Sequence, residues 1–290
     1  MEMQNTIGKS VSASGIALHT GVRVNMRMLP APENTGIVFR RMDLPGAPEV
    51  KAHALNVIDV RRATTIAAPS KAFVVLVEHI MASLHAAKVD NICIEMNSAE
   101  PPICDGSASP FFRMLMEAGI VPQNAPAKTY AVESPLYIEK NGTTIVALPP
   151  EKEGELKITC TVSYAGTLIG TQFLDFVLTP ENFEKELGPC RTFAEYKDLA
   201  TLFQMGLAKG GSLDNAVVIH DGAIISHDGA IISHDGMRFP NELVRHKVMD
   251  MVGDLYLTGV RLSAHIVAVK PGHPTNVALS QAIVGRMSGK

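Results

Sequence analysis

The chain passes twice through the same order of secondary structure, with strands first and helices after them. In the first half, residues 22–29 alternate apolar and polar side chains, which is typical of a half-buried strand, and residues 74–87 carry apolar side chains at helical spacing. The second half repeats this order from residue 137 onward. Because strands precede helices in each half, the pattern predicts an α+β fold rather than a doubly wound parallel sheet.

The stretch between the two halves, residues 121–128, holds two prolines, few apolar side chains and no periodicity. Such a composition is typical of a linker. We therefore expect two domains, 1–124 and 125–290, each large enough to bury a core of its own. With 46% hydrophobic and 19% charged residues, the chain carries enough apolar side chains for both cores.

Composition also limits the partners and the compartment of the protein. The formal net charge of −3 argues against non-specific nucleic-acid binding, which needs a basic surface. We expect no transmembrane segment, because no apolar run approaches the roughly 18 residues of a membrane span. Residues 1–5 lack the basic and apolar regions of a signal peptide, and the four cysteines have no paired spacing. We therefore expect a cytoplasmic protein with reduced thiols.

The most informative segment is residues 240–257, whose apolar side chains recur at helical spacing along one face. His246, Asp250 and Asp254 follow one another at intervals of four residues on another face, so they stack one turn above the next. An imidazole and a carboxylate on one helix, with room for a third ligand and a water, are typical of a catalytic zinc site. The alternative is a solvated polar face with an ordinary His–Asp pair.

Two further segments carry polar groups of the same kind. Glu78 and His79 interrupt an apolar stretch, and a buried acid needs a partner or a metal because desolvating a carboxylate is costly. A histidine ligand beside a glutamate base follows the logic of metalloprotease helices, although a partly exposed helix edge would carry the same pair. His273 follows an apolar strand in a turn, where sites are commonly built. Asp254 could accept a hydrogen bond from its ring and favour the cation.

A short internal repeat lies upstream of the 240–257 segment. Residues 220–226 and 227–233 are identical in sequence, and His234 begins a third copy. Three His-Asp pairs at this spacing would allow a metal site, but Asp-Gly between isoleucine-rich segments is a strong hairpin signal. We favour a hairpin lengthened by a local duplication, which loops out toward solvent because lengthening a loop costs only about 0.6 kcal/mol per doubling.

Taken together, these segments resemble one family, the UDP-3-O-acyl-N-acetylglucosamine deacetylases, which are zinc enzymes of lipid A synthesis. The ordered combination is specific, although no single motif is. The matching stretches follow one another along nearly the whole chain: residues 15–21, 30–37, 77–82, 90–91, 105–108, 191–193, 210–212, 246–250 and 272–273. The one departure is seven additional residues between Val218 and Arg238, and removing one copy of the repeat restores the family spacing.

The resemblance implies a metal centre and a general base. The metal ligands would be His79, His246 and Asp250, with water in the fourth place and either zinc or iron(II) as the ion, since such a ligand set admits both. Glu78 would be the general base. His273 would be its cationic partner, protonating the leaving amine or stabilising the oxyanion.

The resemblance also implies the groups around this centre. Asp254 would orient the imidazole of His273, and the Thr192 hydroxyl would support the oxyanion. Lys247 and Lys270 would contact the sugar nucleotide.

Finally, the resemblance implies how the acylated UDP-sugar is accommodated. Phe193 and the rest of an insert at about 192–216 would form an apolar passage for the acyl chain. The family fold is two similar domains, each a small, mostly antiparallel sheet packed with helices, with the active site between them, and a monomer is expected. The role of His19 stays open. Two alternatives also stay open: a zinc amidase acting on another substrate, and a non-catalytic sugar-nucleotide-binding homologue.

Overall fold

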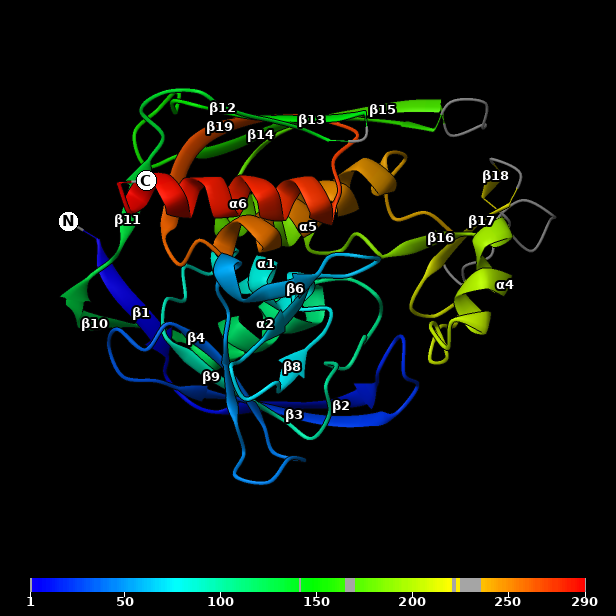
Figure 1. Ribbon diagram of the computed structural model, residues 1–290, viewed down its shortest axis with the longest axis horizontal. Helices are drawn as coiled ribbons and strands as arrows, with labels where there is room; N and C mark the ends of the chain where they lie inside the picture. Colours follow the sequence, from blue (N-terminus) through cyan, green and yellow to red (C-terminus); the bar gives the residue numbers. More distant parts are fainter. Residues whose placement is uncertain (1, 141, 165–169, 221–222, 225–235, 290) are drawn as a thin grey trace.

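The computed structural model arranges the chain in four layers, sheet, helices, helices and sheet (Figure 1). The structure describes residues 2–140, 142–164, 170–220, 223–224 and 236–289. One sheet belongs to each half of the sequence, and both sheets turn an apolar face toward the helices between them. The α+β class expected from the sequence is therefore confirmed, as is its arrangement as two similar units.

The sheet of the first half has five strands in the order β2-β3-β9-β4-β5. In β3, every second side chain is buried and the residues between them are exposed, which is the alternation that a half-buried strand requires. Its strands are β2 (Val11–Ile16), β3 (Arg23–Pro30), β4 (Ile37–Arg41), β5 (Glu49–Lys51) and β9 (Ile92–Met96).

The sheet of the second half repeats this topology in the order β12-β13-β19-β14-β15. In both sheets the last strand in sequence, β9 or β19, lies in the middle, antiparallel to one neighbour and parallel to the other. Its strands are β12 (Leu136–Lys140), β13 (Thr143–Leu148), β14 (Leu156–Tyr164), β15 (Gly170–Val177) and β19 (Arg261–Val269). The short strand β11 (Thr129–Ala131) also pairs with β19.

Two helices from each half form the inner layers, with α1 and α2 over the first sheet and α5 and α6 over the second (Figure 1). Their bounds are α1 (Glu78–Ala86), α2 (Ser109–Ala118), α5 (Glu242–Tyr256) and α6 (His273–Met287). Within the described part of the chain, no helix has both the length and the apolar composition needed to cross a bilayer.

Shorter strands and helices surround the two sheets and the four inner helices. Near the first half lie β1 (Met3–Ile7) paired with β10 (Ile120–Pro126), the 3-10 helix η1 (Ala54–Asn56), and the three-stranded sheet β6 (Val57–Asp59), β7 (Thr65–Ala67) and β8 (Phe73–Val74). The second half adds α3 (Pro180–Asn182), the π-helical turn η2 (Phe183–Leu187), and the unit β16 (Phe193–Glu195), α4 (Tyr196–Gln204), β17 (Val217–His220) and β18 (Ala223–Ile224).

Two local expectations differ from the structure. The helix expected from residue 74 begins at Glu78, because residues 73–74 pair with β7 as strand β8. Most of the expected linker, residues 121–128, belongs instead to β10 (Ile120–Pro126), which pairs with β1. Prolines are tolerated in such a two-stranded ribbon because each strand is an edge strand. The division into domains at residue 124 stays a prediction.

The contact between α1 and α5 joins the two halves. Gly253 on α5 faces the first turn of α1, where a Cβ atom would lie 2.1 Å from the carbonyl oxygen of Glu78 and 3.1 Å from the backbone nitrogen of Ala82. Only glycine allows the helices to approach this closely. A single cluster of buried apolar side chains accordingly runs through both halves.

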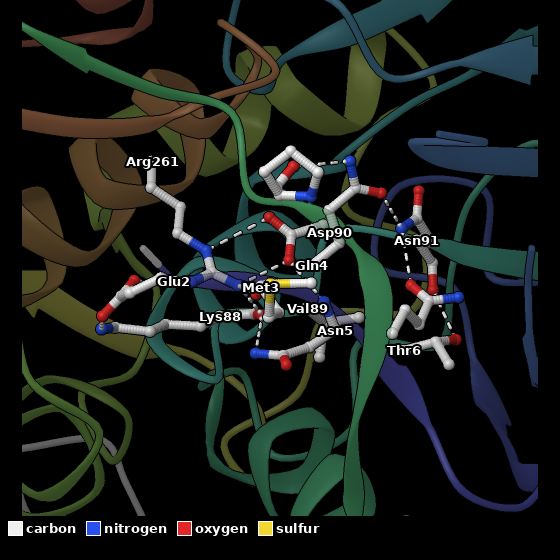
Figure 2. Close-up of polar contacts among 12 residues, drawn as sticks. Glu2, Met3, Gln4, Asn5, Thr6, Lys88, Val89, Asp90, Asn91 and Arg261 are labelled. Carbon is white, nitrogen blue, oxygen red and sulfur yellow. Dashed lines mark hydrogen bonds and ion pairs between the residues drawn. The ribbon is translucent and has the colours of Figure 1, made fainter. Parts of the chain in front are cut away.

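A polar network ties the halves together at another place (Figure 2). Arg261, in the first position of β19, forms an ion pair with Asp90 in the turn between α1 and β9, with Nη2 2.6 Å from Oδ2. The same Asp90 oxygen accepts the backbone N–H of Asn5, and Arg261 also pairs with Glu2. The network therefore holds the start of β19 against β1 and the end of α1.

His85 is a buried histidine of α1 that takes part in the helix contact. Its Nδ1–H donates to the carbonyl of Val252 on α5 at 2.9 Å, and its ring stacks on Tyr256 with the centroids 4.2 Å apart. Burial lowers the pKa of His85 to about 4. The imidazole is therefore neutral in the folded protein at neutral pH.

We predict that His85 makes the protein less stable as the pH falls. Because its pKa is lower in the folded chain than in the unfolded chain, the unfolded state binds more protons between about pH 6.5 and pH 4. The free energy of unfolding should lose about 2 kcal/mol from this residue between pH 7 and pH 5. Urea unfolding of the wild type and of His85→Gln at both pH values would measure this loss. Equal losses in the two proteins would contradict the assignment.

Candidate metal centre

Four polar side chains meet where α1 crosses α5. Glu78 and His79 occupy the first turn of α1, and His246 and Asp250 lie one turn apart on α5. All four are 3% exposed or less. The close approach at Gly253 brings the two helices near enough for these side chains to share one cavity. The partly exposed helix edge that the sequence also allowed for Glu78 and His79 is therefore excluded.

Three of these side chains converge on one point. Nε2 of His246 lies 3.3 Å, and Nε2 of His79 lies 3.9 Å, from Oδ1 of Asp250. One ligand atom from each residue fits within a 4.8 Å span, and no other group of three such residues does so in the described part of the chain. This is the set that the sequence predicted as metal ligands.

The donor atoms fit a divalent metal ion. Oδ1 of Asp250 is buried and has no hydrogen-bond partner among the described residues, which is costly unless a cation or another group satisfies it. Nδ1 of His246 lies 3.1 Å from the carbonyl of Cys190 and must donate to it, so Nε2 keeps its lone pair toward Asp250. Two imidazole nitrogens and a carboxylate oxygen suit zinc or iron(II).

The protonation states agree with this fit. Burial lowers the pKa of His79 to about 3 and also lowers the pKa of His246, so both rings are neutral near pH 7, as metal ligands must be. Burial opposes ionisation of Asp250, but His246 and Lys247 outweigh it and hold the pKa of this carboxyl well below its usual range. Nζ of Lys247 donates to Oδ2 of Asp250 at 2.9 Å.

A second set of groups lies beside the first. Nδ1 of His273, in the first turn of α6, is 2.8 Å from Oδ2 of Asp254, and Nε2 of the same ring is 3.7 Å from Oε1 of Glu78. Thr64 connects these two carboxylates: its hydroxyl donates to Asp254 at 2.6 Å and its backbone N–H donates to Glu78 at 3.1 Å. Asp254 is fully buried.

Glu78 and His273 both have strongly shifted pKa values. Burial raises the pKa of Glu78 to about 7. Burial alone would disfavour the cationic form of His273, but the carboxylates of Asp254 and Glu78 outweigh it and raise the pKa of this imidazole to about 9. A carboxylate that readily accepts a proton therefore faces an imidazolium that can donate one, which is an arrangement typical of acid–base sites.

Two adjoining cavities surround these groups. The polar cavity, of about 250 Å³, is lined by the candidate metal ligands, Glu78 and His273. The other, of about 310 Å³, has mostly apolar walls that include Leu199, Leu202 and Phe203. Four residues line both cavities: Leu18, Arg62, Thr192 and Phe193. The polar cavity therefore adjoins the apolar one, which we call the apolar passage.

The remaining predicted site residues divide into two groups. Thr192 and Phe193 lie at the junction of the cavities, and Lys247 lines the polar one with Nζ 5.2 Å from the centre of the Phe193 ring. Lys270 is instead exposed after the end of β19 and lines neither cavity. His19, whose role the sequence left open, lines the apolar passage.

The repeated segment is described only at its start. His220 ends β17 and pairs with Ala223 of the antiparallel strand β18, as the hairpin interpretation predicts for the first copy. His227 and His234 lie outside the described residues.

Sequence reasoning missed three groups that support the site. Asn276 donates to Oδ2 of Asp254 at 3.0 Å, and its position three residues after His273 on α6 was an available signal. Glu242 lies four residues before His246 and extends the polar stripe of α5 by one turn. No pattern distinguished Thr64, because its contacts with Asp254 and His273 join distant parts of the chain.

Comparison with known proteins points to one family. The sequence model described as "LpxC: UDP-3-O-acyl N-acetylglycosamine deacetylase" matches residues 4–285. The chain is 42% identical to the UDP-3-O-acyl-N-acetylglucosamine deacetylase of Chlamydia felis over 282 residues, which cover 97% of this chain and 96% of that protein. The protein of the same name from Chlamydia pneumoniae is 39% identical with the same coverage, and that of Chlamydia trachomatis serovar D is 38% identical over 97% of this chain and 94% of its own.

We predict that His79→Gln weakens zinc binding by at least tenfold, because it removes one of three protein ligands. His85→Gln, the same substitution six residues further along α1, should leave zinc affinity unchanged. Dissociation constants measured by competition with a chromogenic chelator would test both. Equal affinity in the two variants would exclude His79 as a ligand.

Proposed function

The chain belongs to the UDP-3-O-acyl-N-acetylglycosamine deacetylase family, and on this premise we propose that it is a zinc-dependent hydrolase of lipid A synthesis. Its substrate would be UDP-3-O-acyl-N-acetylglucosamine, the substrate that the names of its relatives give. Hydrolysis of the acetamide would release acetate and leave an amino sugar that keeps its UDP group and its acyl chain.

One observation carries this proposal beyond family membership. The cluster of His79, His246 and Asp250 shares a cavity with a proton acceptor and a proton donor, and this cavity adjoins the apolar passage at Thr192 and Phe193. An amide-hydrolysing centre beside an apolar passage matches a substrate that joins a polar acetamido sugar to an acyl chain.

The metal ion would be held by Nε2 of His79, Nε2 of His246 and Oδ1 of Asp250. When bound, a zinc or iron(II) ion at this position supplies Lewis acidity, which favours deprotonation of a nucleophilic water and polarises the acetamide carbonyl. All other steps belong to side chains of the protein.

Glu78 and His273 would carry the protons. Glu78 accepts a proton from the attacking water as the water oxygen bonds to the acetamide carbon. When the C–N bond breaks, the cationic His273 donates its Nε2 proton to the departing nitrogen, which leaves as an amine. Asp254 holds the His273 ring through Nδ1, so that Nε2 is the atom directed into the cavity.

Neighbouring groups would bind the rest of the substrate. The Thr192 hydroxyl, at the junction of the cavities, would donate to the developing oxyanion. The acyl chain would enter the passage beyond Phe193, between α4 and the residues around Leu18. Lys247 and Lys270 would attract the diphosphate, Lys247 from within the polar cavity and Lys270 from the exposed end of β19.

We predict that Glu78→Gln binds zinc as the wild type does but lowers kcat for acetate release by about 10²- to 10⁴-fold, which is the usual contribution of a general base. Glu117→Gln, which changes an exposed glutamate of α2, is the matched control and should keep full activity. Acetate release in a coupled assay, together with metal content per chain, would test this. Undiminished turnover in Glu78→Gln would refute the assigned base.

We also predict that removing the acyl chain from the substrate lowers kcat/KM by at least 100-fold, because the apolar passage then contributes no binding energy. Acetate release from the acylated and the non-acylated sugar nucleotide would be compared at equal concentrations. Equal turnover of the two would favour a more general zinc amidase. Zinc binding without release from either would favour a non-catalytic homologue.

A further inference from the structure

One peptide group beside α5 is hydrogen-bonded to two side chains on successive turns of that helix. The peptide that joins Cys190 to Arg191 donates its N–H to Oε1 of Glu242 at 2.9 Å, and its C=O accepts from Nδ1 of His246 at 3.1 Å. Glu242 and His246 are four residues apart, so they lie above one another on the same face of the helix. The helix therefore holds this peptide by both of its polar groups.

The carboxylate of Glu242 is itself firmly held. Glu242 is 1% exposed and Arg191 is 2% exposed. The Arg191 side chain donates from Nε to Oε1 at 3.0 Å and from Nη2 to Oε2 at 3.2 Å. The backbone N–H of Arg238 also donates to Oε2, at 2.7 Å. A buried carboxylate with this many donors has one fixed orientation. The hydrogen bond from the Arg191 N–H therefore fixes the orientation of the peptide as well.

We infer that Glu242 is a positioning residue of the metal centre, an inference that rests on the proposed function for its catalytic consequence. By accepting the Arg191 N–H, Glu242 aims the Cys190 carbonyl at Nδ1 of His246 and so fixes the ring with Nε2 toward the metal. The same hydrogen bond polarises the peptide and makes its carbonyl a better acceptor, which raises the basicity of the imidazole.

Glu242 also influences Thr192, the residue at the junction of the two cavities. Thr192 follows the held peptide directly, and its backbone N–H donates to the carbonyl of Gly106 at 2.8 Å. Thr192 is therefore held at the junction of the two cavities by the Glu242-bound peptide that precedes it and by its own hydrogen bond to Gly106. Loss of Glu242 should disturb the metal ligand and the Thr192 hydroxyl together.

The chain provides a matched control for a purely structural role. Arg261 and Asp90 form another poorly exposed arginine–carboxylate pair, with side-chain exposures of 10% and 15%. Figure 2 shows that the partners of this pair are Glu2, Asn5 and neighbouring residues, none of which lines the polar cavity. Breaking this pair should destabilise the fold without changing the metal centre.

The test compares Glu242→Gln with Arg261→Gln in the full-length chain. The readouts are the urea midpoint of the metal-free protein, the zinc dissociation constant from chelator competition, and kcat for acetate release. Both variants should unfold at lower urea concentration. Glu242→Gln leaves one uncharged acceptor oxygen against four donors and turns an amide NH2 toward the others. It should weaken zinc binding by about 10- to 100-fold, the usual effect of perturbing a group that orients a metal ligand, and should lower kcat. Arg261→Gln should change the dissociation constant less than twofold.

A double variant keeps the test decisive if Glu242→Gln does not fold. Arg191→Met combined with Glu242→Met removes both buried charges, a replacement that is often neutral or stabilising, but it still removes the acceptor of the peptide N–H. It should fold and bind zinc at least tenfold more weakly than the wild type.

Three outcomes would overturn the inference: wild-type zinc affinity in the double Met variant, which has no acceptor for the Arg191 N–H; equal losses of affinity in Glu242→Gln and Arg261→Gln; or a wild-type protein that binds no zinc. Failure of the proposed function would look different. Acetate release would then be absent from the wild type, while the differences in zinc affinity among the variants would remain.

Discussion

The close packing of α1 against α5 is the contact on which the rest of the site depends. Each half of the chain builds its own sheet and helices, and neither half alone contains the three candidate metal ligands. The site exists because Gly253 lets the first turn of α1, with Glu78 and His79, come within contact distance of α5. The candidate metal centre is therefore a property of the interface between two similar units, and Arg261 and its partners hold the same two units together elsewhere.

Charge balance explains how so many ionisable groups are buried in one place. The carboxylate of Asp250 pairs with the cationic Lys247, and the carboxylate of Asp254 pairs with the cationic His273 and accepts hydrogen bonds from Thr64 and Asn276. Glu78 accepts a backbone hydrogen bond from Thr64 and faces the cationic His273, but burial outweighs both and raises its pKa to about 7. The same cavity thus holds one carboxylate that ionises readily, suited to a metal, and one that exchanges protons near neutral pH, suited to a base.

The parts of this site that follow from helix geometry were predictable from the sequence, and the parts that depend on distant contacts were not. The spacing of four residues predicted that His246, Asp250 and Asp254 lie on one face of α5. The apolar residues around Glu78 and His79 allowed these two side chains to be buried, with a partly exposed helix edge as the alternative. By contrast, the contact of Thr64 with Asp254 joins residues 190 positions apart, and the proline-containing strand β10 forms only because β1 lies beside it. The family resemblance implied a substrate contact for Lys270, but this residue follows the end of a strand and lines neither cavity.

The central claim is that two imidazoles and one carboxylate, drawn from α1 and α5, bind a single catalytic metal ion. X-ray absorption of the zinc-loaded protein measures this most directly, because it counts the scatterers around the ion. The account predicts two imidazole nitrogens and carboxylate or water oxygens at about 2.0–2.2 Å, in a four-coordinate site. A sulfur ligand at about 2.3 Å, or a shell of oxygens without imidazole, would contradict it.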